Sequence, residues 1–251
     1  MQIIDQPVIS VLGSGSWGTA LALLLARNGC HVQFWGRQAE AILKTGENTA
    51  YFPGVPLLQR MKVCGTLEES IQGTDDILLA VPCVAFASVV EQIKSLNATK
   101  KIVWASKGLD HKNAQLLSSS LDAIWPELNS KGVISGPSFA AEVLAKKPSA
   151  VNVAGNDPDL VQFWCRCLSN EYFRAYPSSD LVGVQLGGAV KNVIAIAAGI
   201  SDGMELGANA RCALITKGLS EMSALGVAMG ASSATFMVLA GIGELMCTAT
   251  V

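Results

Sequence analysis

Three glycines stand at a fixed spacing near the start of the chain, between a short apolar run and a stretch of strong helix formers. Val8–Leu12 is rich in β-branched residues and is typical of a strand, whereas Thr19–Ala26 favours a helix. Gly13 permits a tight turn, Gly15 has no Cβ to block a bound pyrophosphate, and Gly18 lets the helix lie close to the sheet. Free N–H groups at the start of such a helix face an anion. Because of this context, the pattern predicts a dinucleotide-binding site, with a bare strand-to-helix turn as the alternative.

The composition indicates a protein with a large interior and no general affinity for nucleic acid. Half of the 251 residues are hydrophobic and only 15% are charged, so one or two domains with a sizeable core are expected. The net charge of −2 gives no general attraction to nucleic acid. No uninterrupted apolar run approaches the ~18–20 residues of a membrane span. We therefore expect a cytoplasmic protein without a membrane span.

Seven cysteines and two histidines limit the chemistry that the side chains can supply. The cysteines contain no C-x-x-C pair and their number is odd, so reduced thiols are expected. Cys165 and Cys167 lie in a predicted helix and would point apart, which disfavours a redox pair. His31 falls in a predicted strand and His111 in a polar loop, so a zinc site or a Ser-His-Asp triad is disfavoured and no metal is expected. Proton transfer must then use Lys, Asp, Glu or Tyr.

Strands and helices are predicted to alternate up to about residue 180, after which only helices are expected. The alternation predicts an α/β fold: a doubly wound, Rossmann-type dinucleotide-binding domain over residues 1–180 with a parallel sheet, followed by an all-helical substrate and catalytic domain over residues 181–251. After the first strand, the predicted strands are His31–Trp35, Ile77–Val81, Lys101–Ala105, Val133–Ser135, Ala150–Val153 and Phe173–Tyr176. The predicted helices after the first are Ala39–Lys44, Phe86–Ile93, Ala114–Ile124, Pro158–Leu168, Val182–Ile200, Asn209–Gly226 and Ser232–Leu239.

The residues after the second predicted strand bear on the choice of cofactor. In the common NAD-binding arrangement, an acidic residue about 20 positions beyond the glycines binds the ribose hydroxyls. Here the strand ends in Trp35-Gly36-Arg37 and no acid follows until Glu40. Because Arg37 can pair with a 2′-phosphate that an acid would repel, NADP(H) is favoured and NAD(H) stays possible. The alternative for Arg37 is a solvated surface charge.

A second group of polar residues lies in a helical stretch, residues 185–199, that is apolar on nearly every face. Such a helix is predicted to be buried, so its polar side chains Lys191 and Asn192 require a reason. Because a buried ammonium tends to lose its proton, Lys191 could take the hydroxyl proton when hydride leaves carbon and return it in reduction. Gly187 and Gly188 would leave open space one turn away. The alternative is a lysine that reaches past its apolar stem into water.

Other polar groups are predicted to meet at the carboxyl edge of the sheet, where ligands bind in open α/β folds. Lys107 follows a strand and is placed to stabilise an alkoxide or a phosphate, while Gly136-Pro137-Ser138 offers N–H groups and a hydroxyl. Glu244 is an isolated carboxylate in an apolar segment and could pair with a buried lysine. Each of these groups taken singly is common in loops of proteins without a catalytic site, and it is their combination that predicts a catalytic site.

Several long motifs occur in fixed order along the chain. They are residues 13–22, Asn48 with Tyr51-Phe52-Pro53-Gly54, Val81-Pro82, residues 106–109, 135–140 and 188–193, Asn209-Ala210-Arg211, and residues 214–219. With these motifs the chain resembles the NAD(P)-dependent glycerol-3-phosphate dehydrogenases of the bacterial type. The resemblance implies reversible hydride transfer between NAD(P)H and dihydroxyacetone phosphate, which gives sn-glycerol 3-phosphate for phospholipid synthesis, in a cytoplasmic homodimer.

The resemblance also implies a role for individual residues. Lys191 would be the general acid and base, with Lys107 and Glu244 as further catalytic groups. Substrate would contact Lys107, Gly136, Ser138, Lys191, Asn192 and Thr248. The cofactor would contact Gly13, Ser14, Gly15, Ser16, Trp17, Gly18, Arg37, Phe86, Lys107 and Ala140.

Two departures from the family pattern stand out. Glu244 occupies a position that is usually aspartate, so its pairing with Lys191 could be displaced by the extra methylene. The chain also stops at Val251, before a Ser-Arg-Asn motif whose arginine helps to bind substrate phosphate and cofactor, so the helical domain is expected to be incomplete.

Two other functions stay open. One is a 3-hydroxyacid or 6-phosphogluconate-type dehydrogenase, although the segment Asn48–Gly54 and the turn Lys107-Gly108 disfavour it. The other is a truncated, non-catalytic NADP-binding protein.

Overall fold

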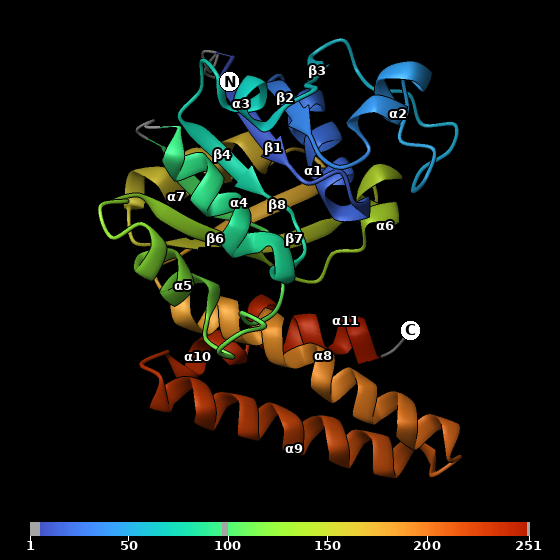
Figure 1. Cartoon of the computed structure of the whole chain (residues 1–251). Coiled ribbons are helices and arrows are strands. Elements are labelled where there is room, and N and C mark those ends of the chain that lie inside the picture. The colour runs from blue at the N-terminus through green and yellow to red at the C-terminus, as the bar shows by residue number, and fades with distance from the viewer. Residues whose placement is uncertain (1–5, 97–99, 250–251) are drawn as a thin grey trace.

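The computed structural model describes residues 6–96 and 100–249, and residues 1–5, 97–99 and 250–251 lie outside the description. One sheet of eight strands in the order β3-β2-β1-β4-β5-β6-β7-β8 forms the upper part of Figure 1, and the last helices lie below it. The strands are β1 (Val8–Leu12), β2 (His31–Trp35), β3 (Met61–Val63), β4 (Asp76–Leu79), β5 (Lys101–Trp104), β6 (Lys131–Ser135), β7 (Ser149–Gly155) and β8 (Phe173–Ser178). The helices are α1 (Ser16–Arg27), α2 (Ala39–Thr45), α3 (Leu67–Ile71), α4 (Cys83–Ser95), α5 (Leu117–Ile124), α6 (Ala140–Leu144), α7 (Pro158–Leu168), α8 (Leu181–Gly203), α9 (Gly207–Ala228), α10 (Ser233–Phe236), the π-helical turn η1 (Leu239–Gly243) and α11 (Glu244–Ala249).

The strand register brings several carboxyl ends to one edge of the sheet. Leu12 at the end of β1 pairs with Trp35 of β2 on one side and with Leu79 of β4 on the other. Chain order reverses between β1 and β4, and a ligand crevice forms at such a switch point in open α/β sheets. The glycine-rich turn between β1 and α1 lies at this position.

Apolar side chains cover both faces of the sheet and the space beneath it. One cluster packs α1 and α7 on the sheet, and includes Leu24 and Trp164. A second cluster packs α3, α4 and α5 on the opposite face, around Trp104. A third cluster, around Leu186 and Phe236, joins the later helices to one another. The sheet is thus buried on both faces, which is why its strands are almost continuously apolar.

The expected α/β architecture is confirmed, with one correction to the sheet. The sequence predicts a parallel sheet, but β6 and β7 pair in the antiparallel direction, with Ile134 opposite Val153. The connection between them contains only the five-residue helix α6, instead of the longer helix that usually joins two parallel strands. The prediction also omits β3, α3 and α6, which have three to five residues each and are too short to show a period.

The last helical segment also differs from the expectation. Residues 232–239 are predicted as one helix, but α10 ends at Phe236 and the π-helical turn η1 follows. A Cβ at Gly241 would collide with the backbone of Phe236, so this turn requires a glycine where the chain approaches itself.

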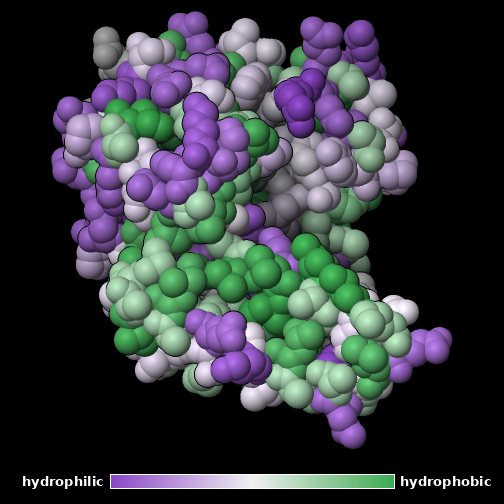
Figure 2. All heavy atoms as spheres, turned by 60° about the horizontal axis from the view of Figure 1, so that its bottom comes forward, coloured by the Kyte–Doolittle hydropathy of each residue, from purple (hydrophilic) through white to green (hydrophobic). Residues whose placement is uncertain are grey.

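Helix α8 is not buried on all sides, which corrects a second expectation. Val193, Ile196 and Ile200 are 59–68% exposed, because neither α9 nor the sheet packs on that face of the described chain. Figure 2 shows that apolar residues cover much of the surface of the helical segment. Among the described helices, α8 alone is long and apolar enough to cross a membrane, and somewhat more than half of its most apolar stretch is buried in the protein. Such burial is typical of a core helix.

Candidate active site

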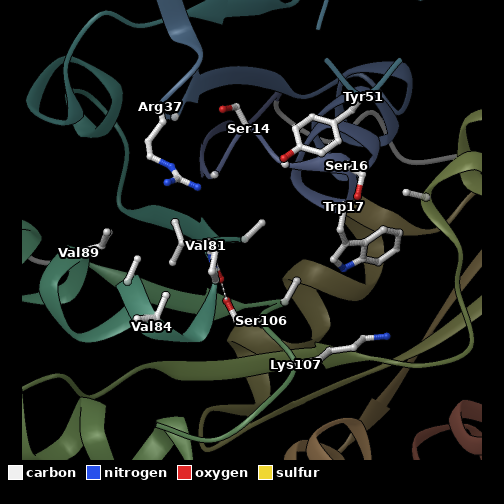
Figure 3. A pocket seen from close by; sticks show the side chains of 18 of the residues that line it. Ser14, Ser16, Trp17, Arg37, Tyr51, Val81, Val84, Val89, Ser106 and Lys107 are labelled. Atoms are coloured by element: carbon white, nitrogen blue, oxygen red, sulfur yellow. Dashed lines mark hydrogen bonds between the residues drawn. The ribbon is translucent and has the colours of Figure 1, made fainter. Parts of the chain in front are cut away.

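A cavity of about 970 Å³ joins the glycine-rich turn to the helical segment. Gly13 and Trp17 line one part of it, while Lys191 of α8 and Thr248 of α11 line another. Lys107, which follows β5, also lines the cavity, and Figure 3 shows its side chain below Trp17. The Lys107 Nζ lies 6.0 Å from the centre of the Trp17 ring, within the range of a cation–π contact.

The three glycines of the turn have three different steric roles. Gly13 has φ +125°, and a Cβ there would collide with the backbone of Ala80. A Cβ at Gly18 would collide with the carbonyl oxygen of Gly13, so α1 can lie this close only with glycine. Gly15 faces the cavity, and a Cβ there would meet no described atom within 4 Å. The space beside Gly15 is therefore available to a ligand.

The start of α1 suits an anion. Gly15 supplies no side-chain cap, and the first turn of α1 carries no acidic residue. The backbone N–H groups of this turn, together with the helix dipole, then favour a negative group in the cavity. Among the described residues that line the cavity there is no carboxylate, whereas Arg37, Lys107 and Lys191 are basic.

Arg37 and Tyr51 mark the end of the cavity near β2. Figure 3 shows both side chains entering the cavity, with Ser14 between them. Arg37 is exposed, as expected for a group that meets a charged ligand or water. Tyr51 was not among the predicted site residues, although the segment Asn48–Gly54 contributed to the resemblance; it is an aromatic residue in a loop rich in turn formers.

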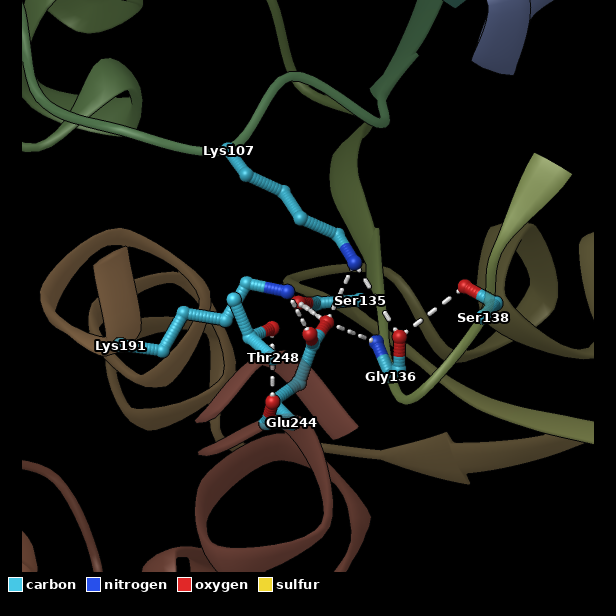
Figure 4. A network of polar contacts seen from close by, with 7 residues as sticks. All are labelled: Lys107, Ser135, Gly136, Ser138, Lys191, Glu244 and Thr248. Atoms are coloured by element: carbon cyan, nitrogen blue, oxygen red, sulfur yellow. Dashed lines mark hydrogen bonds and ion pairs between the residues drawn. The ribbon is translucent and has the colours of Figure 1, made fainter. Parts of the chain in front are cut away.

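Glu244, which is not among the described lining residues, accepts four hydrogen bonds, two of them from the lysines that line the cavity (Figure 4). Its carboxylate is fully buried, and its Oε1 accepts from Lys107 Nζ at 2.5 Å, from Ser135 Oγ at 2.8 Å and from the Gly136 N–H at 2.6 Å. Its Oε2 accepts from Lys191 Nζ. The extra methylene of glutamate thus still permits contact with both lysines.

Two glycines of α8 allow this cluster to form. A Cβ at Gly187 would collide with the carbonyl oxygen of Ala240, and a Cβ at Gly188 would lie 2.6 Å from Ser135 Oγ. The sequence predicts open space here, and that expectation is wrong, because η1 and the end of β6 fill it. The glycines instead bring Glu244 and Ser135 close to the helix that carries Lys191.

The buried charges alter the protonation of the cluster. Burial by itself would raise the pKa of Glu244, but the Lys107 and Lys191 ammonium groups outweigh it and lower that pKa below its usual range. Burial lowers the pKa of Lys107, with the Lys191 charge acting in the same direction and Glu244 acting against both. The cluster therefore holds one carboxylate between two ammonium groups, with a lysine that gives up its proton more readily than usual.

The other predicted site residues fall into three groups. Ser138, Ala140, Asn192 and Thr248 line the cavity together with the two lysines, although Asn192 is exposed rather than buried. The Ser138 hydroxyl donates to the Gly136 carbonyl at 3.0 Å and the Thr248 hydroxyl to the Glu244 carbonyl at 3.0 Å. Gly18 and Gly136 are not among the described lining residues: Gly18 packs on the Gly13 carbonyl, and the Gly136 N–H donates to Glu244. Phe86 is not among the described lining residues: its ring is completely buried 5.8 Å from that of Trp104, in an edge-to-face contact.

These features fit a nicotinamide dinucleotide. The turn leaves room for a pyrophosphate at Gly15, and the lining offers basic groups without a carboxylate. The Trp17 indole Nε1 is buried without a hydrogen-bond partner among the described residues, so it has a donor to spare. Within the described chain, no group of three or more His, Cys, Asp and Glu residues could hold a metal ion.

A dinucleotide-binding sheet that shares one cavity with a lysine–carboxylate cluster on a helical segment is the arrangement of nicotinamide-dependent dehydrogenases. The family described as NAD-dependent glycerol-3-phosphate dehydrogenase matches the chain twice, with its N-terminal part over residues 8–161 and its C-terminal part over residues 180–251. The chain belongs to this family.

Individual relatives agree with this assignment. The glycerol-3-phosphate dehydrogenase [NAD(P)+] of Halorhodospira halophila is 46% identical over 245 residues, which cover 96% of this chain and 74% of that protein. The crystal structure of the Coxiella burnetii glycerol-3-phosphate dehydrogenase superposes with a TM-score of 0.92 at 42% identity, covering 98% of this chain and 76% of the other. The Plasmodium falciparum glycerol-3-phosphate dehydrogenase gives a TM-score of 0.90 at 28% identity, with 98% and 74% covered.

Proposed function

We propose that this chain carries out the NAD(P)H-dependent, reversible reduction of dihydroxyacetone phosphate to sn-glycerol 3-phosphate, which supplies glycerophospholipid synthesis. The observation that carries the proposal is that one cavity contains both the open turn at Gly15 and the two lysines that Glu244 binds. The names of the relatives, which are glycerol-3-phosphate dehydrogenases, support the choice of substrate.

Lys191 is the proton carrier in this proposal. A bound nicotinamide supplies the hydride to the carbonyl carbon. The carbonyl oxygen then gains a proton from the Lys191 ammonium, and Lys191 is reprotonated from water; in the oxidative direction Lys191 accepts the proton. Glu244 orients the ammonium by accepting one of its hydrogen bonds. The side chain of Lys191 is 10% exposed, so little water competes for its remaining protons.

Lys107 has a different place in the same site. Its Nζ binds Glu244 Oε1 and the Gly136 carbonyl, the latter at 3.1 Å, and its side chain is 17% exposed. A fixed positive charge there stabilises the alkoxide that develops on the substrate oxygen, or the substrate phosphate. The Ser138 hydroxyl and Asn192 supply further polar groups toward the substrate.

The cofactor is proposed to be NADP(H) in preference to NAD(H). Arg37 reaches the cavity beside Ser14, and no carboxylate lines that region of the described chain, so a 2′-phosphate meets a positive charge and no negative one.

We also propose that the protein is a cytoplasmic homodimer without a nucleic-acid partner. The exposed apolar side chains of α8 support the dimer, because a second subunit would cover them. Light scattering of the purified protein tests the dimer.

The test is oxidation of NADPH by purified protein with and without dihydroxyacetone phosphate. We expect oxidation only when the triose phosphate is present. Lys191→Ala should lower turnover by about 10²- to 10⁴-fold with little change in NADPH affinity, because it removes the proton donor and not the dinucleotide site. Lys101→Ala serves as the matched control, because Lys101 lies at the amino end of β5, away from the carboxyl ends of the strands where the site lies. Normal turnover in Lys191→Ala would contradict the role of this lysine.

Two further outcomes separate the alternatives. Turnover with a 3-hydroxyacid or 6-phosphogluconate, and none with the triose phosphate, would favour the other dehydrogenase type. NADPH binding without turnover of any of these substrates would favour a non-catalytic binding protein.

A further inference from the structure

One buried side chain joins the loop between α2 and β3 to the glycine-rich turn. Asn48 is only 2% exposed, and its Nδ2 donates two hydrogen bonds, to the Ser14 carbonyl at 2.9 Å and to Thr19 Oγ1 at 2.8 Å. The Thr19 hydroxyl passes the interaction on by donating to the Gly15 carbonyl at 2.8 Å. One N–H of the Asn48 amide therefore holds the Ser14 carbonyl directly, and the other orients the Thr19 hydroxyl, which reinforces the hydrogen bond that the Thr19 N–H donates to the Gly15 carbonyl at 2.9 Å.

These bonds fix the direction of the groups that an anion would meet. In a planar trans peptide the N–H points opposite to the C=O of the same unit. The Ser14 carbonyl shares its unit with the Gly15 N–H, and the Gly15 carbonyl shares its unit with the Ser16 N–H. Because both carbonyls are held on the side of Asn48 and Thr19, these two N–H groups point the other way. Gly15 and Ser16 line the cavity, so we place the N–H groups on its side.

The backbone of Asn48 shapes a second wall of the cavity. Its carbonyl accepts hydrogen bonds from the Tyr51 N–H at 3.1 Å and from the Phe52 N–H at 2.8 Å. The loop is closed further on, where the Gly54 N–H donates to Glu47 Oε2 at 2.5 Å and Gly54 has φ +80°. This turn directs the Tyr51 side chain into the cavity, opposite Arg37 (Figure 3).

We propose that Asn48 is a positioning residue for the dinucleotide: its amide aims the N–H groups of the glycine-rich turn and its carbonyl holds the turn that presents Tyr51. It does so without touching the cavity, since it is absent from the described lining residues. The inference rests on the proposed function in one respect, that the ligand is NADPH. Its consequence is specific: loss of the Asn48 amide weakens NADPH binding and leaves the triose phosphate end of the site unchanged.

The test uses two substitutions of similar shape. Asn48→Asp keeps the side-chain shape but removes both N–H donors, and Asn48→Leu replaces the amide by apolar groups. The dissociation constant of NADPH, followed through the fluorescence of the protein with Trp17 in the cavity, should rise by about tenfold in both, the factor that 1.4 kcal/mol corresponds to. The amide chemical shifts of Gly15 and Ser16 should change in the free protein, and the KM of dihydroxyacetone phosphate should stay within twofold.

A matched control comes from another asparagine that ties loops together. The Asn170 Nδ2 donates to Asn28 Oδ1 at 2.8 Å, and the Asn170 Oδ1 accepts from the Tyr172 and Phe173 N–H groups, far from the cavity lining. Asn170→Leu should lower the thermal midpoint without changing the NADPH dissociation constant. If the control weakens NADPH binding as much as the Asn48 variants do, the effect is general destabilisation and the inference is overturned.

Thr19→Val keeps the inference testable if the Asn48 variants do not fold. It removes the hydroxyl that relays the interaction to Gly15, and should raise the NADPH dissociation constant by about threefold to tenfold. Unchanged NADPH affinity in Thr19→Val and in any folded Asn48 variant would overturn the positioning role while the proposed function stands. Failure of the wild-type protein to bind NADPH would instead overturn the proposed function, and with it the ligand assigned to this loop.

Discussion

Replacing Glu244 by glutamine tests whether one buried carboxylate holds the sheet and the helical segment together. Its oxygens accept from Lys107 after β5, from Ser135 and Gly136 at the end of β6, and from Lys191 of α8. Glutamine has nearly the same shape, but one oxygen becomes an NH₂ group that faces other donors. Glu244→Gln therefore removes the negative charge and one acceptor in a single change.

The magnitude follows from the charges that remain. The wild-type cluster contains two ammonium groups and one carboxylate, and Glu244→Gln leaves the two ammonium groups without a partner. Removal of one member of a buried ion pair costs about 3 to 5 kcal/mol. Lys191→Met instead leaves Glu244 paired with Lys107 and still bound by Ser135 and Gly136, so it should cost only about 1 to 2 kcal/mol. At about 2 to 4 °C per kcal/mol, Glu244→Gln should lower the thermal midpoint by roughly 6 to 20 °C.

The pH dependence has a definite sign. Since the folded pKa of Glu244 is lowered, its contribution to stability is present above the unfolded value of about 4.3 and is lost as the pH falls through the folded pKa. The folded pKa of Lys107 is also lowered, so between that pKa and the unfolded value of about 10.4 the unfolded chain binds more protons, and stability rises with pH there. Glu244→Gln should therefore flatten the acid part of the stability curve.

Urea unfolding at neutral and acid pH measures both effects. The free energy of unfolding should decrease in the order wild type, Lys191→Met, Glu244→Gln, and the difference between wild type and Glu244→Gln should shrink as the pH falls toward the folded pKa. A Lys191→Met protein that is less stable than Glu244→Gln would refute the charge argument. A decrease of less than about 1 kcal/mol in the free energy of unfolding of Glu244→Gln would also refute it.

Three further substitutions test the dinucleotide site. Arg37→Asp should raise the dissociation constant of NADPH by at least about tenfold more than that of NADH, because only NADPH carries the 2′-phosphate; equal weakening of the two in parallel titrations would exclude this contact. Gly15→Ala should change the free energy of unfolding by no more than about 0.5 kcal/mol but weaken NADPH binding, since the added Cβ enters open space in the cavity. Gly18→Ala should lower thermal stability, because its Cβ would collide with the Gly13 carbonyl; loss of NADPH binding by both variants with equal stability would contradict the division of roles.

The parts of the fold that could be predicted from sequence are those with local causes. The turn at Gly13, Gly15 and Gly18 is recognisable from residues 13–18 alone, and Gly18 packs on the Gly13 carbonyl within the same strand–turn–helix unit, whereas the contact of Gly13 with Ala80 is not visible in that pattern. Long periodic helices such as α8 were also predicted, as was the change from strands to helices. The burial of α8 could not be predicted in full, because an apolar face shows no sign in the sequence of whether another segment packs on it.

The site was harder to predict than the fold because its contacts are distant along the chain. The Lys107–Glu244 contact joins residues 137 positions apart, and the bond from Asn48 to Ser14 joins residues 34 positions apart. The sequence indicated that Glu244 could pair with a buried lysine, and the structure gives it two. It did not indicate Asn48 as a link to the turn, because an asparagine beside turn residues is ordinary in a loop.

The geometry at Glu244 depends on the π-helical turn that precedes it. Residues 239–243 form η1, although the sequence pattern predicted a helix that ends at Leu239, and Glu244 begins α11 directly afterwards. A π-helical turn contains about one residue more than an α-helical turn, and one residue corresponds to a rotation of about 100° around the helix axis. The backbone of Val238 is extended, so η1 starts a new helical segment instead of continuing α10, and Glu244 takes its direction from that segment. Gly241 lies against the Phe236 backbone where no Cβ fits, so glycine at this position lets the chain form the turn directly before Glu244, the carboxylate that accepts from both lysines (Figure 4).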